Sequence, residues 1–398
     1  MLPSRSFCVL AEVLLVSALS TRNSTAPSYR QDLLDLHREL VEISSNSGLE
    51  EAAGKYLHNY LSDKGWAVKD IPVDPRSNTP DNATRFNILA GAKGSDTLGA
   101  KVLLNTHFDT VPPHIGYSIE EGEITGDTQI SGRGSVDAKA SLAAMVIALT
   151  ELVEAGEVSP KDVGLAFVVG EEVGGEGIKA LGQYWTENTP SFNAIIFGEP
   201  TEGKLACGHK GGMTCTLNAY GVAGHSGYPE LGRSATAILI KALDKILEAD
   251  LGSSILFGNT TVNVGQLEGI AVNNVIADHA LAGFGVRVAV GPQSEGATVV
   301  KEKIQGILDE VDLENLLLSC NQGYGPVETN CDVEGFETDV MKYGTDIPKL
   351  ELDRKFEKYL YGPGTIFVAH SVNENVTVGA LEEAVESYKK LVLNALDR

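Results

Sequence analysis

The chain has 398 residues, of which 43% are apolar, and it carries 43 glycines and a formal net charge of −23 at pH 7. This composition is typical of a globular chain with one large or two ordinary domains, and it excludes a disordered chain. The negative charge disfavours binding to nucleic acid or to an anionic membrane surface, because both repel acidic proteins.

The N-terminal residues predict a secretory signal. Arg5 precedes a short apolar run, residues 7–19, and small residues at its end suit cleavage after Ser20. The run is shorter than the ~20 residues that a bilayer span needs. We therefore expect residues 1–20 to be removed and the mature protein to be secreted. Glu12, inside the run, favours the alternative of a cytosolic N-terminal helix.

Asparagine and cysteine positions fit an extracellular protein. Asn-x-Ser/Thr triplets begin at Asn23, Asn82, Asn259 and Asn375, and they predict a glycoprotein. Cysteines remain at 207, 215, 320 and 331, an even number that suits an oxidising compartment. Three pairings are possible, and proximity favours Cys207 with Cys215 and Cys320 with Cys331. None lies in a Cys-x-x-Cys pattern, so we expect no zinc–thiolate site.

The first half of the chain alternates between helical and strand patterns. Helical periodicity covers residues 29–61 and 138–155, and apolar runs predict strands at 66–73, 102–105, 163–169 and 194–197. The stretch 78–87 is polar and rich in turn formers, so we expect a surface loop there. Nearly continuous apolar strands are typical of a sheet covered on both faces.

Histidine or carboxylate side chains follow three of these apolar strands. They are His107 and Asp109, Glu171 and Glu172, and Glu199. Asp137 precedes the helix at 138–155, where backbone N–H groups favour an anion. Ligands bind at the carboxyl ends of strands in an open α/β sheet, so these groups should meet there. Converging carboxylates repel one another unless a cation neutralises them.

The second half begins with a change of pattern that predicts an inserted domain. Strand, helix, strand, strand, helix and strand follow one another at 213–222, 234–251, 260–267, 275–290, 297–311 and 316–320. This is the ferredoxin-like arrangement. We predict a catalytic domain in two parts, 21–211 and 322–398, with the insertion at 212–321. A final helix covers residues 380–396.

The candidate ligands suit two metal ions. They are His107, Asp137, Glu171 or Glu172, Glu199 and His370. Imidazole and carboxylate favour zinc, and cobalt or manganese less exclusively. Five groups fit one bridging carboxylate and two ligands per metal, with a shared water driven toward hydroxide. Adjacent carboxylates in an extended segment would point to opposite sides, which leaves one free as a general base.

The glycine-rich run at 174–177 allows a phosphate-binding alternative. It lacks the Gly-Lys-Ser/Thr ending of a P-loop and the Gly-x-Gly-x-x-Gly of a dinucleotide site. A tight loop passing close to the metals is the favoured interpretation.

Six motifs occur together in one order. They are His-x-Asp at 107–109, Gly-Ser-Val-Asp-Ala-Lys at 134–139, Gly-Glu-Glu at 170–172, Gly-Glu-Pro-Thr at 198–201, Gly-His-Ser at 224–226 and Ala-His-Ser at 369–371. With them the chain resembles the dinuclear zinc hydrolases of metallopeptidase family twenty (clan MH), which include aminoacylase, acetylornithine deacetylase, succinyl-diaminopimelate desuccinylase and carboxypeptidase G. It looks most similar to secreted fungal members named probable carboxypeptidases.

The resemblance implies a fold and a role for each ligand. The fold would be a zinc-peptidase-like mixed sheet flanked by helices, with the insertion serving as a dimerisation or lid domain. His107 and Glu199 would hold one Zn²⁺ ion, Glu172 and His370 would hold the other, and Asp137 would bridge them. Glu171 would act as general base and acid, and Asp109 would orient His107.

The resemblance also implies substrate contacts and a homodimer. In dimeric relatives the histidine equivalent to His225 reaches the partner's site and stabilises the oxyanion. Asn274 and Arg287 would contact the substrate, the arginine through its carboxylate, and Gly364 would present a backbone N–H. The chain departs from the family pattern at Ala277, where proline is common, and before Arg287, where an aspartate usually stands two residues earlier.

Together these observations predict a secreted zinc exopeptidase, a probable carboxypeptidase, cleaving an amide bond next to a free carboxylate with a metal-bound hydroxide. An N-acyl-amino-acid deacylase or an aminopeptidase on the same site is the first alternative. A non-catalytic metal-binding homologue and a nucleotide-binding oxidoreductase are more distant ones.

Overall fold

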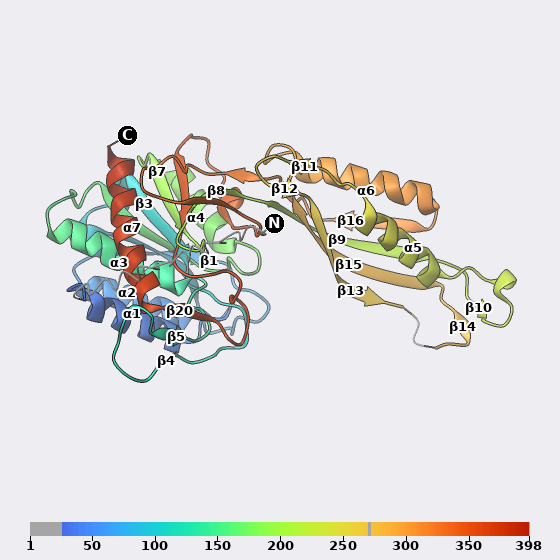
Figure 1. The fold of residues 1–398 in the computed structure, drawn as a ribbon, viewed down its shortest axis with the longest axis horizontal. Coiled ribbons are helices and arrows are strands. Elements are labelled where there is room, and N and C mark those ends of the chain that lie inside the picture. The colour runs from blue at the N-terminus through green and yellow to red at the C-terminus, as the bar shows by residue number, and fades with distance from the viewer. Residues whose placement is uncertain (1–25, 270–271, 398) are drawn as a thin grey trace, which may run out of the picture.

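A computed structural model of the chain describes residues 26–269 and 272–397. The predicted signal and the triplet at Asn23 lie outside the described residues. The molecule is elongated, with a large sheet and its helices at one end and a smaller sheet with two helices at the other (Figure 1). No helix within the described ranges is long and apolar enough to cross a membrane.

The large sheet has nine strands and is mixed. Its order is β1-β2-β6-β3-β7-β19-β8-β17, and β18 pairs with β8. The bounds are Ala67–Val73 (β1), Arg85–Gly91 (β2), Val102–His107 (β3), Val163–Val168 (β6), Ala194–Gly198 (β7), Leu205–His209 (β8), Val327–Glu328 (β17), Thr338–Met341 (β18) and Glu357–Tyr361 (β19). A small three-stranded sheet lies beside it, formed by β4 (Ser118–Ile119), β5 (Gln129–Ser131) and β20 (Asn375–Thr377).

Helices cover both faces of the large sheet. Their bounds are Arg30–Glu42 (α1), Glu51–Asp63 (α2), Lys139–Glu154 (α3), Glu176–Asn188 (α4) and Val378–Leu396 (α7). Along β3, Val102 and Leu104 pack in one core with α1, α2, α3 and α7, whereas Leu103 packs in the other core with α4. Successive strand residues point to opposite faces, so both faces need apolar side chains.

Four neighbouring strands of this sheet run in the same direction. β6 is parallel to β3, β3 to β7, and β7 to β19. Their carboxyl ends therefore lie along one edge of the sheet, and the loops that follow them emerge side by side.

The smaller sheet joins β9 (Gly211–Tyr220), β13 (Thr261–Glu268), β15 (His279–Val288) and β16 (Leu316–Cys320) in the order β13-β15-β9-β16, all antiparallel. Helices α5 (Ala235–Glu248) and α6 (Gly296–Asp312) pack on it with their own apolar core. This is the ferredoxin-like arrangement. Two short pairs, β11 (Ser253–Ser254) with β12 (Gly258–Asn259) and β10 (Gly224–His225) with β14 (Val275–Ile276), lie outside the sheet.

Two secondary-structure predictions were wrong. The stretch 78–87 is not all loop, since β2 begins at Arg85 and is buried throughout. Its polar residues are tolerated because Arg85 pairs with buried Glu50, and the Asn87 amide bonds the backbone of Gly177 and Val169. The long strand predicted at 275–290 is broken into β14, which pairs with β10, and β15, which pairs with β9.

The disulfide pairing favoured by proximity was also wrong. Cys215 bonds Cys320, and Cys207 bonds Cys331. Cys215 and Cys320 are partners on the adjacent strands β9 and β16. Strand pairing therefore decides the disulfides. It brings Cys215 and Cys320, which are 105 positions apart in the sequence, into bonding distance.

Candidate metal centre

The site begins with side chains delivered by parallel strands. His107 ends β3, and Glu199 follows the end of β7, its direct neighbour. Glu171 and Glu172 follow β6, on the other side of β3. Nε2 of His107 lies 3.8 Å from Oε1 of Glu199. Sheet register alone therefore places these groups at one edge.

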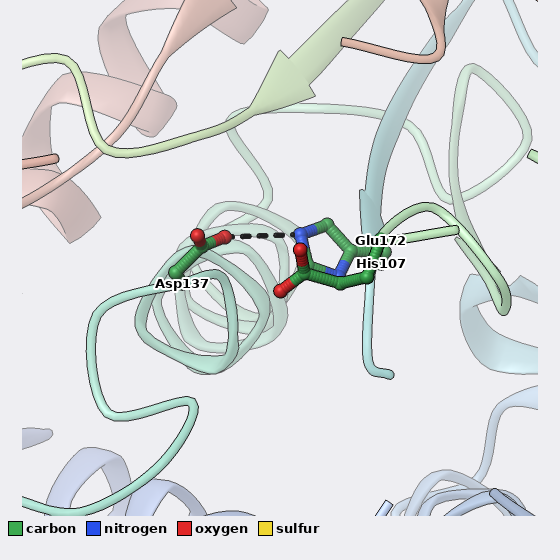
Figure 2. A group of neighbouring side chains, drawn as sticks. All are labelled: His107, Asp137 and Glu172. Carbon is green, nitrogen blue, oxygen red and sulfur yellow. Dashed lines mark hydrogen bonds and ion pairs between the residues drawn. The ribbon is translucent and has the colours of Figure 1, made fainter. Parts of the chain in front are cut away.

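Asp137 lies between two histidines. It stands two residues before α3 begins, and its Oδ1 is 3.2 Å from Nε2 of His107. Its Oδ2 is 3.2 Å from Nε2 of His370. In Figure 2 the carboxylates of Asp137 and Glu172 point toward one another beside the His107 ring. One carboxylate thus has an oxygen directed at each histidine.

His370 completes this side of the cluster from the far end of the chain. It lies in the loop after β19, with a backbone φ of 63°, and its side chain is 52% exposed. Its Nε2 is 2.9 Å from Oε2 of Glu172. A left-handed backbone conformation is uncommon outside glycine, so surrounding segments of the same chain must hold His370 in place.

The adjacent glutamates take separate positions. The segment is a turn rather than the extended chain that was expected. Ligand atoms of Glu172 lie within 4.8 Å of those of His107 and Asp137, and Glu171 forms a similar group with His107 and Glu199. The two carboxylates are therefore separated, by a turn instead of by strand alternation.

The pKa values of several residues are raised in this cluster, which holds more carboxylates than positive charges. Burial raises the pKa of Glu199 to about 7, although His107 opposes the shift. Burial and Glu199 raise the pKa of Glu171 well above its usual range. Hydrogen bonds to Asp137 and Glu172 raise the pKa of His370 to about 10. The cluster therefore retains protons near neutral pH, and a divalent cation would displace them.

Asp109 organises the loop around the cluster. The Nδ1 atom of His107 lies 3.0 Å from the backbone oxygen of Asp109 and 3.6 Å from its carboxylate. That carboxylate accepts hydrogen bonds from the Ser47 hydroxyl and from the backbone N–H groups of Glu171 and Glu172. Asp109 thus fixes the turn that carries both glutamates, in addition to lying beside His107.

The donor set fits a pair of metal ions. Two imidazoles and several carboxylates are ligands of zinc, and of cobalt or manganese. Asp137 has one oxygen toward each histidine, as a bridging ligand would. Glu199 lies on the His107 side, and Glu172 on the His370 side.

Comparison with known proteins decides the family. The sequence model of Peptidase family M20/M25/M40 matches residues 103–394. The chain belongs to this family. It is 48% identical to a peptidase M20 domain-containing protein of Sordaria macrospora, over 96% of this chain and 88% of that one. It is 42% identical to a probable carboxypeptidase of Paracoccidioides brasiliensis, over 92% and 86% respectively.

The fold agrees with this family assignment. A tripeptidase from Staphylococcus aureus superposes with a TM-score of 0.74 at 22% identity, over 93% of this chain and 99% of that one. The chain is thus an M20 metallopeptidase, with the mixed α/β fold of its structural neighbours. The family is generally dependent on two metal ions, and the chain has candidate ligands for them.

In this M20 peptidase the predicted substrate residues lie in three places. Gly364 lies against the Asp137 loop. A Cβ atom added at Gly364 would lie only 2.5 Å from the side chain of Val136. Arg287 is exposed at the end of β15 that adjoins the large sheet, close to Gly344. His225 and Asn274 are exposed at the opposite tip of the smaller sheet, near β10 and β14 (Figure 1). Within one chain, the last two are not brought to the cluster.

Sequence reasoning missed Asp346. It lines one small cavity with His107, Glu171 and Glu199, and it is 4% exposed. Its Oδ2 has no hydrogen-bond partner in the described parts of the chain. Burial raises its pKa to about 6. It follows no apolar strand, so the signal that identified the other carboxylates was absent here.

Proposed function

We propose that this M20 metallopeptidase is a secreted carboxypeptidase that binds two zinc ions. The bridging position of Asp137 between His107 and His370 carries the proposal. His107 and Glu199 would hold one ion, and Glu172 and His370 the other. When bound, the two ions would supply charge that lowers the pKa of a water and polarises a carbonyl group.

Glu171 is proposed as the general base and acid. It lies in the same cavity as His107 and Glu199, and burial keeps its pKa high, which suits a group that accepts and returns a proton. Asp109 would hold the Glu171 backbone in place through its hydrogen bond to that N–H group. Its carboxylate would thus position the base.

We assign recognition of the substrate's free carboxylate to Arg287. Gly364, which lies near the metal cluster, would donate its backbone N–H to the same carboxylate. Arg287 lies near Gly344, and that segment leads directly to Asp346 in the cavity beside the cluster. A guanidinium group can bind a carboxylate through two hydrogen bonds. The similarity to proteins named probable carboxypeptidases also supports recognition of the substrate's C-terminal end.

A homodimer would explain the positions of His225 and Asn274. Their segments are adjacent, since the Ser226 N–H donates to the Asn274 carbonyl oxygen over 3.0 Å. β13 is an exposed edge strand of the smaller sheet, which suits pairing with a second copy. In such a dimer, the tip of one chain would complete the partner's site and His225 would stabilise the oxyanion.

Secretion has two further supports. All four cysteines in the described part of the chain are disulfide-bonded, as expected in an oxidising compartment. Asn82 and Asn259 are exposed and accessible to glycosylation, whereas Asn375 is half-buried in β20. We therefore propose glycans at the first two positions.

Substrate profiling tests the proposal. Purified enzyme should cleave N-blocked peptides with a free C-terminal carboxylate and release the last amino acid. The same peptides with an amidated C-terminus should be cut at least tenfold more slowly. Equal cleavage of the amidated peptides, or a requirement for a free N-terminus, would point to an aminopeptidase. Preference for N-acetyl amino acids would point to a deacylase.

A further inference from the structure

A buried ion pair joins the two loops that carry Asp137 and His370. Arg133 and Glu374 are 241 residues apart in the chain, and Nη1 of the arginine lies 2.6 Å from Oε2 of the glutamate. Their side chains are only 2% and 1% exposed. The pair lies just beyond the strands β5 and β20, which pair with each other at Ser131 and Asn375.

Each partner of the pair binds the backbone of one ligand loop. Oε1 of Glu374 accepts hydrogen bonds from three backbone N–H groups, those of Gly134, Val136 and Asp137, at 2.8, 3.2 and 3.3 Å. Three donors on one carboxylate oxygen hold the loop that presents Asp137 in a single conformation.

Arg133 acts on the other loop. Its Nη2 donates to the backbone oxygen of His370 at 3.2 Å, and its Nη1 donates to that of Ser371 at 3.1 Å. His370 has left-handed backbone and a half-exposed side chain, so its own packing does little to fix it. The guanidinium group supplies the missing restraint on its carbonyl group.

His107 and Glu199 do not depend on this pair. His107 lies at the end of β3 and Glu199 directly after β7, and these central strands are held by the sheet. We propose that Arg133 and Glu374 are positioning residues that join the loop of the bridging Asp137 to the loop of His370, so that the metal site of Glu172 and His370 depends on them most. The inference rests on the proposed two-zinc site and goes beyond it, because it predicts that loss of the pair weakens the two sites unequally.

Zinc titration of the metal-free protein, by competition with a chromophoric chelator, tests this. Wild type should bind two equivalents. Glu374→Ala should weaken the site of Glu172 and His370 by about 10–100-fold, the usual effect of losing a group that orients a metal ligand. The site of His107 and Glu199 shares only Asp137 with the released loops, so it should weaken clearly less. Glu374→Gln retains an acceptor for the backbone N–H groups, so it should show a smaller loss at the site of Glu172 and His370.

Two controls separate positioning from general destabilisation. Glu382→Gln breaks another pair between distant parts of the chain, Arg30 with Glu382, and it should leave both zinc affinities unchanged. His370→Ala should weaken the site of Glu172 and His370 most strongly, which identifies the site that Glu374→Ala weakens more. Circular dichroism checks folding, and if Glu374→Ala does not fold, Glu374→Gln decides by the same criterion.

The contrary outcomes are distinct. Equal weakening of both sites, or unchanged binding in folded Glu374 variants, would overturn the positioning role while leaving the two-zinc proposal intact. A wild-type protein that binds fewer than two zinc ions would overturn the proposed function and this inference with it.

Discussion

Oδ2 of Asp137 lies 3.2 Å from Nε2 of His370, although the smaller sheet and most of the large one separate the two residues in the sequence. The other oxygen of Asp137 lies at the same distance from His107. The cluster therefore cannot form until the C-terminal part of the chain has docked beside the N-terminal part. It is a property of the complete fold of the large sheet.

Glu171→Gln tests the general base. The substitution keeps the size of the side chain but removes proton transfer, so kcat should fall by about 10²–10⁴-fold. Zinc content should stay at the wild-type value, measured by inductively coupled plasma mass spectrometry on the same samples. A variant that turns over at the wild-type rate would refute the assignment, and one that loses zinc would make Glu171 a ligand.

Mixing two inactive variants tests whether His225 acts in the partner's site. Glu171→Ala and His225→Ala should each be nearly inactive alone. After co-refolding in equal amounts, mixed dimers contain one site with both native residues, so activity should return to about a quarter of wild type. This fraction assumes random pairing of chains in a dimer. No recovery, with mixed dimers present, would exclude action in trans.

Asp346→Asn should stabilise the metal-free protein at neutral pH. The carboxyl pKa is raised from 3.8 to about 6 in the fold, so the folded state favours the protonated form and loses stability as pH rises through this window. Asparagine cannot ionise, and the gain at pH 7 should be about 2–3 kcal/mol. Urea unfolding at pH 4 and pH 7 measures it. A gain of equal size at both pH values would contradict the titration argument.

His370 should give the metal-free protein a pH signature of the same sign over a higher pH range. Its pKa is raised from 6.5 to about 10, so its ion pairs stabilise the fold fully below pH 6.5 and are lost as pH rises toward 10. The thermal midpoint measured in chelator should fall across this range. His370→Asn should show a shallower fall, and parallel curves for the two proteins would contradict the prediction.

Much of the cluster could be predicted because it follows a simple rule of parallel sheets. His107 ends one apolar strand, Glu199 directly follows another, and Glu172 lies in the turn after a third. The sequence shows both the strands and their polar ends. Ferredoxin-like connectivity was equally visible as a pattern of elements. These features depend on local periodicity, which a single sequence contains.

The rest depends on contacts between distant segments. The strand β2 was missed because Arg85 is neutralised by Glu50, a partner that only the fold supplies. Arg133 and Glu374 resemble ordinary loop charges until both loops are in place. The disulfide pairs follow strand pairing and not chain distance. Such relations are tertiary, so no local pattern indicates them.

A crystal structure of the zinc-loaded protein, with anomalous data collected on both sides of the zinc edge, would show directly whether two zinc ions share Asp137. We predict two anomalous peaks about 3.5–4 Å apart, with Asp137 bridging them. One peak should be bound by His107 and Glu199, and the other by Glu172 and His370. A single peak, or two peaks without Asp137 between them, would contradict the proposed two-zinc site.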